Sequence, residues 1–160
     1  MPRYIQHWSG VSCRVFALLM AAASGYANEN PVRGQLLYVP VYSEVPYGDK
    51  RFTLNLTATL SVRNPDRKSP ITIKRVEYYS AAGDLVRSYL KQPAPLRPMA
   101  STEYIVRESD RSGGISASFL VEWESDAPVA PPFVEAVMVN STYNQGVAFS
   151  SPARVLEERR

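Results

Sequence analysis

The sequence has one cysteine and one histidine, Cys13 and His7, and both lie within its first 27 residues. Those residues have the pattern of a secretory signal peptide, which is removed from the mature protein. A mature chain without cysteine and histidine cannot form a Cys/His zinc site, a disulfide, or a nucleophilic centre that uses either side chain. We therefore predict no metal site, no cofactor and no enzymatic activity, and a fold held together by core packing.

The signal-peptide pattern has three parts. Arg3 and Arg14 give a basic segment without acidic residues, and residues 15–23 form an apolar run. Gly25 and Ala27 are the small residues of a cleavage site after Ala27. Since the apolar run is well short of the roughly 20 residues that span a bilayer, we expect cleavage, a periplasmic or secreted protein, and no integral membrane span in the mature chain.

Excess positive charge is also absent once the signal peptide is removed. The chain has 18 Lys and Arg against 15 Asp and Glu, and the signal peptide takes two arginines and no acid, which leaves 16 against 15 and a net charge of +1. A near-neutral domain without a basic stripe has no electrostatic footprint for nucleic acid or anionic membrane. We expect a protein or small-molecule partner and no nucleic acid.

Alternation of apolar and polar side chains is the strongest pattern that the sequence does have. It runs through residues 52–65, where Asn64 and Pro65 end the strand, and it recurs over residues 115–123. We predict that these two strands are the facing centres of two sheets. Their apolar positions are Phe52, Leu54, Leu56, Ala58, Leu60, Val62, Ile115, Ala117, Phe119, Val121 and Trp123.

Proline marks two other stretches. Residues 35–43 are rich in β-branched and aromatic side chains but contain Pro40, which cannot donate to a ladder, so we predict a first strand at a sheet edge. Residues 91–99 contain three prolines and are predicted to be an extended crossover rather than a paired strand.

The strand predicted over residues 71–80 changes the parity of its apolar positions midway. A slip of one residue would turn every later side chain to the wrong face, which predicts a β-bulge near Lys74 or Arg75. The turn at residues 82–84 then reverses the chain into a hairpin.

Short strands at regular spacing, with turns between them and no helical periodicity, indicate an all-β protein. We predict an antiparallel immunoglobulin-like β-sandwich of about seven or eight strands, preceded by the signal peptide. The predicted organisation is a signal peptide over residues 1–27, a flexible lead-in over 28–34, one sandwich domain over 35–155 and a charged tail over 156–160.

Candidate ligand-binding residues cluster in one loop, where Glu108 and Asp110 precede Gly113 and Gly114. Carboxylates beside flexible glycines suit a hard cation, and a glycine backbone suits an anion. The spacing matches no defined calcium loop, and a plain connecting turn has the same composition.

Tyrosines are a second candidate feature, with Tyr42 and Tyr47 as the residues that we assign to ligand binding. Tyrosine offers a large contact area with a polar tip, which suits a recognition surface, although sheet surfaces favour tyrosine in any case.

Paired carboxylates are a third feature. Glu122 and Glu124 are two residues apart on one predicted strand, so they lie on the same face at a spacing of about 6.6 Å. Glycosidases use carboxylate pairs at comparable separations, whereas a solvated sheet face carries the same residues without chemistry.

Six segments carry a resemblance to a known family: YVPVYS at 38–43, LTATLSVRNPD at 56–66, YYSAAGDLVRSYL from 78, SGG with FLVEW within 112–123, VEAVMV at 134–139 and QGVAFSS from 145. In these segments the chain resembles a bacterial family of unknown function made of small exported β-sandwich proteins and lipoproteins. The resemblance implies a lone exported β-rich domain without an assigned activity. The chain lacks the lipobox of the lipoprotein members.

Residues 60–86, with an Asn-Pro turn between two strands and a glycine hairpin, are also similar to the water-stress and hypersensitive-response domain of late embryogenesis abundant proteins. Our hypothesis is an exported, non-enzymatic binding or interaction module in the periplasm. A stress-protective domain of the late embryogenesis abundant type is the alternative that this similarity implies, and a carboxylate-dependent hydrolase using Glu122 and Glu124 is a second alternative.

Overall fold

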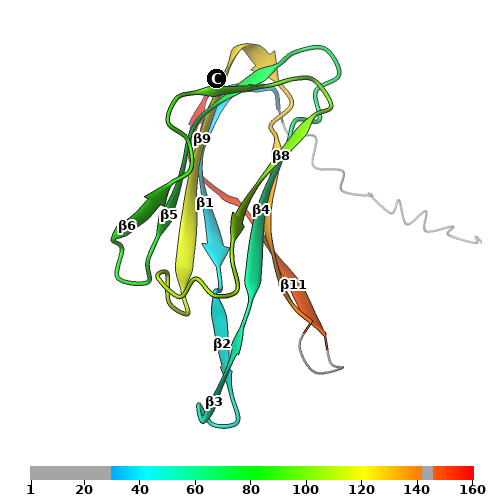
Figure 1. Ribbon diagram of the computed structural model, residues 1–160. Coiled ribbons are helices and arrows are strands. Elements are labelled where there is room, and N and C mark those ends of the chain that lie inside the picture. The colour runs from blue at the N-terminus through cyan, green and yellow to red at the C-terminus, as the bar shows by residue number, and fades with distance from the viewer. Residues whose placement is uncertain (1–29, 142–145) are drawn as a thin grey trace, which may run out of the picture.

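Two antiparallel sheets pack face to face in the computed structural model of the protein, which describes residues 30–141 and 146–160 (Figure 1). This arrangement confirms the prediction of an all-β antiparallel sandwich. The predicted signal peptide, residues 1–27, lies outside the described residues.

The first sheet has β9 at its centre, and its other strands lie to either side. Both β6 and β7 pair with β5: β7 pairs with the first residues of β5 and β6 with its last residues. In spatial order the strands are β12 (Arg154–Arg159), β1 (Val32–Val41), β9 (Ala117–Val129), β5 (Ile71–Tyr79) and β6 (Leu85–Ser88), with β7 (Ala94–Leu96) off this path.

The second sheet has four strands, and β4 lies in its interior. Two further strands, β2 (Glu44–Tyr47) and β3 (Phe52–Asn55), form a separate hairpin. In spatial order the second sheet consists of β11 (Val147–Pro152), β10 (Phe133–Asn140), β4 (Thr57–Arg63) and β8 (Ser101–Val106).

The core lies between β9 and β4, as the two alternating stretches predicted. Phe119, Val121 and Trp123 of β9 and Leu60 and Val62 of β4 are all fully buried. Burial of side chains of this size contributes about 1.5–3 kcal/mol each before conformational entropy is subtracted, so these two strands dominate the stability of the domain.

The stretch predicted as one core strand over residues 52–65 is divided in two. Its second part, β4, is buried as expected, but its first part, β3, leaves the sandwich to pair with β2. Phe52 is therefore 57% exposed, so the prediction that it is a core residue was wrong, whereas Leu54 is half-buried and packs against the core cluster. The prediction that Ile115 is a core residue was also wrong. Ile115 lies in the loop before β9, which begins at Ala117, and it is 42% exposed.

The first strand is not at an edge, as Pro40 had led us to predict. β1 lies between β9 and β12, and Pro40 stands opposite Ser118 of β9. The ladder with β12 ends at the pair Tyr38–Arg154, so the proline lies beyond β12 and takes no hydrogen bond away from it.

The strand beside β1 is the segment predicted as a charged tail, residues 156–160. β12 runs to Arg159 and pairs with β1, and its charged side chains suit an exposed edge strand. The predicted lead-in, residues 28–34, also overlaps a strand, because β1 begins at Val32, which is buried.

The predicted bulge is present, since the register of β5 against β9 shifts between Ile73 and Arg75. The β5–β6 hairpin is confirmed as well. The proline-rich stretch 91–99 does contain a paired strand, contrary to prediction: β7 pairs with the first three residues of β5, and Leu96, opposite Ile71, is buried in the core.

The Asn-Pro turn after β4 is held by a buried side chain. Asn64, which is 2% exposed, donates from Nδ2 to the carbonyls of Ser69 at 3.0 Å, Leu96 at 3.3 Å and Arg97 at 3.2 Å. Its Oδ1 accepts the N–H of Asp66 at 3.0 Å. Asn64 thereby satisfies backbone groups of two separate loops, which gives this motif a structural role.

Candidate functional site

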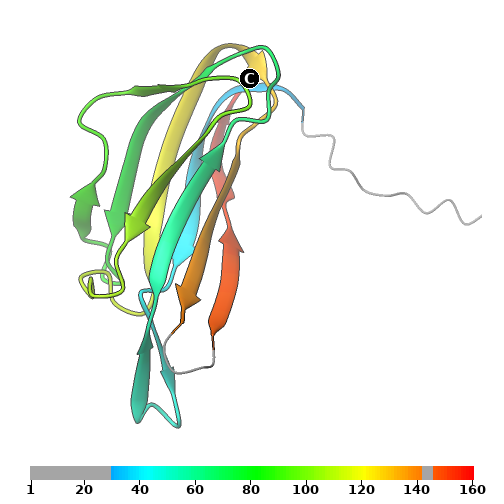
Figure 2. The same ribbon diagram turned by 45° about the vertical axis from the view of Figure 1, so that its right-hand side comes forward.

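The β2–β3 hairpin projects from one end of the sandwich, and the two ends of the described chain lie at the other (Figures 1 and 2). Among the described strands, β2 and β3 pair only with each other. The hairpin is therefore not part of either sheet of the sandwich.

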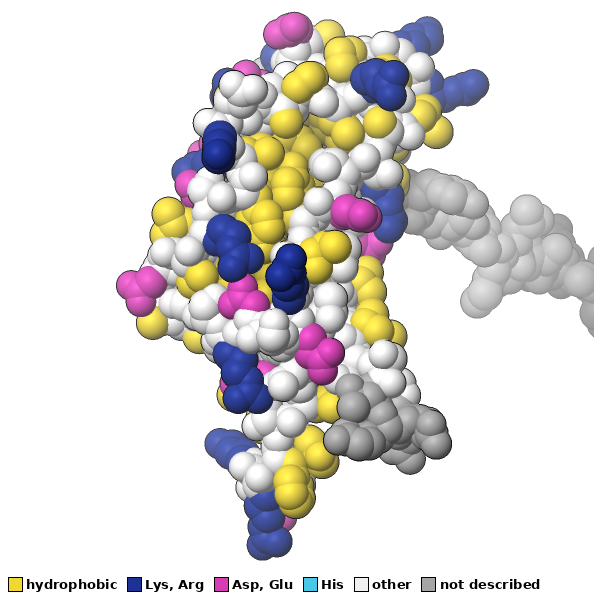
Figure 3. Space-filling model, in the orientation of Figure 1, with side chains coloured by type: hydrophobic (Ala, Val, Ile, Leu, Met, Phe, Trp, Pro, Cys, Tyr) yellow, Lys and Arg dark blue, Asp and Glu magenta, His cyan; other side chains and the backbone are white. Residues whose placement is uncertain are grey.

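The tip of the hairpin exposes two aromatic rings. Tyr47 and Phe52 face each other at the ends of β2 and β3 and stack with their ring centroids 5.3 Å apart and an interplanar angle of 29°. The two residues are 55% and 57% exposed. Figure 3 shows hydrophobic and basic side chains together at this end of the molecule.

The turn between the two rings, residues 48–51, is conformationally strained. Gly48, Asp49 and Lys50 have φ angles of 58°, 56° and 67°, and the N–H of Arg51 donates to the carbonyl of Gly48 at 3.0 Å. Left-handed backbone is unfavourable for residues other than glycine, and such strain collects at functional positions. Asp49, Lys50 and Arg51 are exposed, so the tip has one acidic and two basic groups beside the rings.

The base of the hairpin is held by the loop between β8 and β9, residues 107–116, which we call the bracket loop. Arg111 donates from Nη2 to Oδ1 of Asn55 at 2.7 Å, and its Nε lies 3.9 Å from Oε2 of Glu44. From the other side, Asn140 donates from Nδ2 to the carbonyl of Asn55 at 2.7 Å. Both strands of the hairpin are thus fixed where they leave the sandwich.

A buried serine joins the same loop to the start of the hairpin. Ser43 donates from Oγ to the carbonyl of Gly114 at 2.6 Å, and its own carbonyl accepts the N–H of Leu56 at 2.9 Å. Ser43 is fully buried, so these hydrogen bonds are protected from water. They set the point at which the chain enters and leaves the hairpin.

The carboxylates predicted to bind a ligand have partners within the protein. Glu108 accepts from Nδ2 of Asn140 at 3.2 Å. Asp110 accepts from Oγ of Ser112 at 2.5 Å and from Nη2 of Arg87 at 2.7 Å. The hydrogen bond from Ser112 is the main cause that lowers the pKa of Asp110, and Arg87 lowers it further. Both carboxylates therefore fix the bracket loop in place.

The two glycines of the loop have a packing role. A Cβ at Gly113 would lie 1.9 Å from the hydroxyl of Tyr78, so only glycine fits there. Gly114 has a left-handed φ of 70°. Burial of the Tyr78 hydroxyl beneath them raises its pKa to about 12.

The predicted tyrosines lie apart from each other. Tyr42 is half-buried and makes an edge-on contact with Phe149 of β11, with the ring centroids 5.8 Å apart, whereas Tyr47 is at the hairpin tip. The structure thus does not bring the six predicted residues into one concave site. It places Tyr47 at the exposed tip, the four loop residues at the hairpin base, and Tyr42 against the core cluster.

Sequence reasoning missed three residues of this region: Phe52, Asn55 and Arg111. Phe52 has the parity of a core residue, and only the turn residues 48–51 signalled that β3 pairs with β2 instead. Asn55 and Arg111 are 56 positions apart, and no local pattern connects them.

The described residues contain no group of three or more His, Cys, Asp or Glu side chains placed to hold a metal ion. Within the same part of the chain, no helix has the length and apolar character needed to cross a membrane.

The carboxylate pair on β9 belongs to a ladder of ion pairs. Glu122 lies 2.8 Å from Nε of Arg75, and Glu124 lies 2.8 Å from Nζ of Lys74. Arg159 of β12 lies 3.5 Å from Glu122 and 3.8 Å from Glu124. The hydrogen bond from Lys74 lowers the pKa of Glu124, which is opposite to what a general acid requires.

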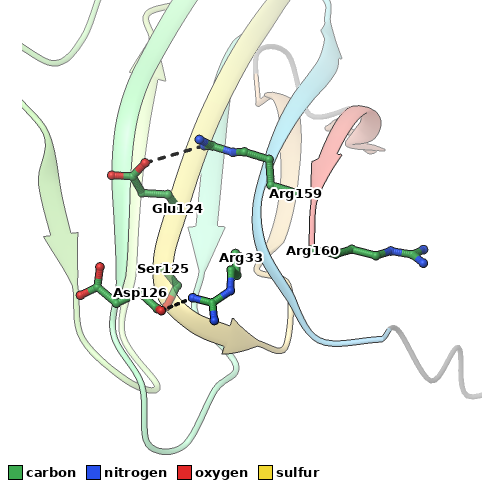
Figure 4. A pocket seen from close by; sticks show the side chains of 6 residues that line it. All are labelled: Arg33, Glu124, Ser125, Asp126, Arg159 and Arg160. Atoms are coloured by element: carbon green, nitrogen blue, oxygen red, sulfur yellow. Dashed lines mark hydrogen bonds and ion pairs between the residues drawn. The ribbon is translucent and has the colours of Figure 1, made fainter.

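A pocket at the end of the sandwich opposite the hairpin is lined by three arginines, Arg33, Arg159 and Arg160 (Figure 4). In Figure 4, Arg159 reaches across β1 toward Glu124, and Arg33 donates to the carbonyl of Asp126. Arg160 is paired with Glu158 at 3.0 Å. The contacts of Arg33 and Arg159 join β1 and β12 to β9, whereas the partner of Arg160 lies two residues away at the end of the same strand. These contacts give the arginines a structural role.

The fold and the hairpin end define a small β-sandwich domain with a projecting, aromatic-tipped hairpin. The chain belongs to a bacterial family described as "Protein of unknown function (DUF3124)", whose model matches residues 34–156. This confirms the resemblance to a bacterial family of unknown function.

Among solved structures, the chain is similar to one from Thermotoga maritima, titled "Crystal Structure of Thermotoga maritima 1070". The sequences are 13% identical, the TM-score is 0.49, and the match covers 81% of this chain and 98% of the other. No curated protein matches the sequence.

Proposed function

We propose that the protein is a non-enzymatic interaction module that binds a protein partner through the tip of the β2–β3 hairpin. The observation that carries this proposal is the stacked pair Tyr47–Phe52, more than half exposed at the end of a projecting element. Aromatic side chains dominate the energetics of protein interfaces when a partner pocket desolvates them.

A rigid tip favours binding, because less conformational freedom is lost when the complex forms. The bracket loop supplies that rigidity at the base through Arg111 and Ser43, and the stacked rings supply it at the tip. The predicted ligand-binding loop therefore acts by positioning the hairpin, and the contact itself is made by Tyr47 and Phe52.

A protein partner suits the hairpin better than a bilayer does. No other strand of residues 30–141 and 146–160 pairs with the outer edge of β2 or β3. The N–H and C=O groups of those edges would be unsatisfied in lipid, whereas a partner strand or side chains can pair with them. The tip also has a net charge of only +1 from Asp49, Lys50 and Arg51, so attraction to an anionic surface is weak.

Export places this interaction outside the cytoplasm, in the periplasm or the medium. Support for export comes from the signal-peptide pattern of residues 1–27. The two alternatives have less support. The Asn-Pro turn, on which the stress-protective alternative rests, has a structural role through the hydrogen bonds of Asn64. The two carboxylates of the hydrolase alternative, Glu122 and Glu124, are engaged in ion pairs.

A quantitative pull-down tests the proposal. Wild-type protein carrying a C-terminal tag, which leaves the hairpin free, is used as bait in periplasmic extract of the bacterium that makes it, beside a Tyr47→Ser/Phe52→Ser variant. The matched control is Phe133→Ser, which removes an aromatic ring that is 65% exposed on β10.

We expect one partner to be retained by the wild type and by Phe133→Ser, and to be lost with the double variant. Vesicles of anionic phospholipid should not sediment the wild-type protein. Equal retention by all three baits, or sedimentation that depends on Tyr47 and Phe52, would show that the tip does not bind protein.

A further inference from the structure

A shallow groove of about 350 Å³ lies on the outer face of the first sheet, away from the hairpin tip. Its walls are Tyr38 of β1 and Tyr79 of β5, and its floor is formed by Ser118 and Leu120 of β9, with Ser116 just before that strand. The register places Tyr38 opposite Leu120 and Tyr79 opposite Ser118. Two aromatic rings thus flank a floor that carries two small hydroxyl side chains.

None of the described residues that line the groove is charged. Of the charged groups beside it, Glu77 accepts a hydrogen bond of 2.8 Å from the Tyr79 hydroxyl and lies 3.6 Å from Arg75, and Arg154 of β12 stands opposite Tyr38 in the β1–β12 ladder. A ligand that carried a net charge would find no counter-charge among the residues that line the groove, so the groove suits a neutral molecule.

The backbone beneath the groove is already paired on both sides. Tyr38 stands between Leu120 and Arg154 in the ladders of β1, and Ser118 stands between Pro40 and Tyr79 in those of β9. A peptide strand therefore cannot extend the sheet at this position. A ligand has to be recognised by side chains alone, through ring faces and hydroxyl groups.

We propose that this groove binds a neutral oligosaccharide chain, laid across β1, β9 and β5 with sugar rings packed on Tyr38 and Tyr79. A pyranose ring has an apolar C–H face that packs on an aromatic ring, and hydroxyl groups that pair with serine. Tyr38 is 38% exposed, and the Tyr79 ring is held in place by the hydrogen bond of its hydroxyl to Glu77. Ser80 and the exposed Ser116 line the groove with hydroxyl side chains, and Ser118, which is 8% exposed, lies in its floor.

Titration of the full mature chain with cellohexaose and, separately, chitohexaose tests this site, with amide chemical shifts as the readout. The two sugars differ in their N-acetyl groups, and polygalacturonate serves as the charged counterpart. We expect saturable binding of at least one neutral sugar, shifts centred on Tyr38, Tyr79 and Ser118, and no binding of polygalacturonate.

Variants then assign the contact. Tyr38→Ala and Tyr79→Ala should each weaken binding about two- to tenfold, the range of one aromatic contact. Tyr79→Phe keeps the ring but loses the hydrogen bond to Glu77, and it should weaken binding less than Tyr79→Ala does. Tyr47→Ala, an exposed tyrosine of the hairpin, should also bind the sugar normally, so that failure of this site and failure of the hairpin proposal are distinguishable.

Three results would overturn the proposal. The first is the absence of saturable shifts with either neutral sugar. The second is binding that persists unchanged in Tyr38→Ala and Tyr79→Ala. The third is concentration-dependent dimerisation in which the groove amides shift without sugar, which would mean that a second copy of the chain occupies the groove.

Discussion

Arg111 donates a hydrogen bond of 2.7 Å to the side-chain oxygen of Asn55, across 56 positions of the sequence. The contact joins the middle of the bracket loop to the last residue of β3, at the base of the projecting hairpin. The bracket loop has the composition of an ion site, but this contact shows that it holds the base of the hairpin. The loop determines the direction in which the hairpin leaves the sandwich.

Removal of this contact should loosen the hairpin without unfolding the domain. In Arg111→Ala we expect the amides of β2 and β3 to exchange with deuterium faster, while amides of β9 keep their protection. Because Arg111 is largely exposed, the free energy of unfolding should fall by less than about 1 kcal/mol. Arg107→Ala, in the same loop, is the control, and equal exchange of the hairpin in both variants would contradict the assigned role of Arg111.

Gly113→Ala should destabilise the whole domain. The added Cβ would lie 1.9 Å from the Tyr78 hydroxyl and 2.7 Å from the Cβ of Ala117, and overpacking of a well-packed core costs about 1–3 kcal/mol. Urea denaturation measures the loss. Gly146→Ala is the matched control, because its Cβ would meet nothing closer than the Asn140 carbonyl at 3.7 Å. A Gly113→Ala variant as stable as the control would show that Tyr78 moves aside without cost.

Much of the fold could be predicted from local pattern, since period-2 alternation reports which face of a strand is buried. The alternation over residues 56–62 and 117–123 identified β4 and β9, and the change of parity between Ile73 and Val76 identified the bulge of β5. Where prediction failed, partners distant in sequence decided the outcome. Pairing with β12 placed β1 inside the sheet despite Pro40, and pairing with β2 drew Phe52 out of the core.

Less of the candidate site could be predicted. Tyr47 has the exposure that a recognition residue needs, but its partner Phe52 has the sequence signature of a core residue. Glu108 and Asp110 have the composition of an ion site, and only the structure shows that Asn140, Arg87 and Ser112 use their oxygens. A single sequence records which groups can form hydrogen bonds, but not which partners the fold supplies.

Leu56→Asp should leave the domain unfolded. Leu56 is fully buried at the junction between the hairpin and β4, and an ionised carboxylate there would lack both water and a partner. We expect loss of the cooperative thermal transition by circular dichroism. Thr57→Asp changes the adjacent residue, whose side chain lies on the opposite face of the strand, and should melt cooperatively. A cooperative melt for Leu56→Asp would mean that this junction is not part of the core.

Stability should fall in acid because of the turn after β4. Asp66 accepts the N–H groups of Lys68 and Ser69 at 2.8 Å each, and these hydrogen bonds, that of Lys68 first, lower its pKa. A carboxyl whose pKa is lower in the folded state stabilises the fold above its unfolded-state value of about 3.9, and this contribution is lost as the pH falls through the folded-state value. Urea midpoints between about pH 2 and 6 should fall less steeply for Asp66→Asn than for the wild type, whereas parallel curves would exclude Asp66 as a cause.

Site-specific photocrosslinking at the hairpin tip tests the proposed interaction most directly. A photoreactive phenylalanine analogue is placed at Tyr47 in cells that make the full chain, and for comparison at Phe133 on the outer face of β10. If the tip binds a protein, we expect a discrete crosslinked protein from position 47 that is absent from position 133 and is lost when Phe52→Ser is added. Crosslinks from position 133 with none from position 47 would contradict it.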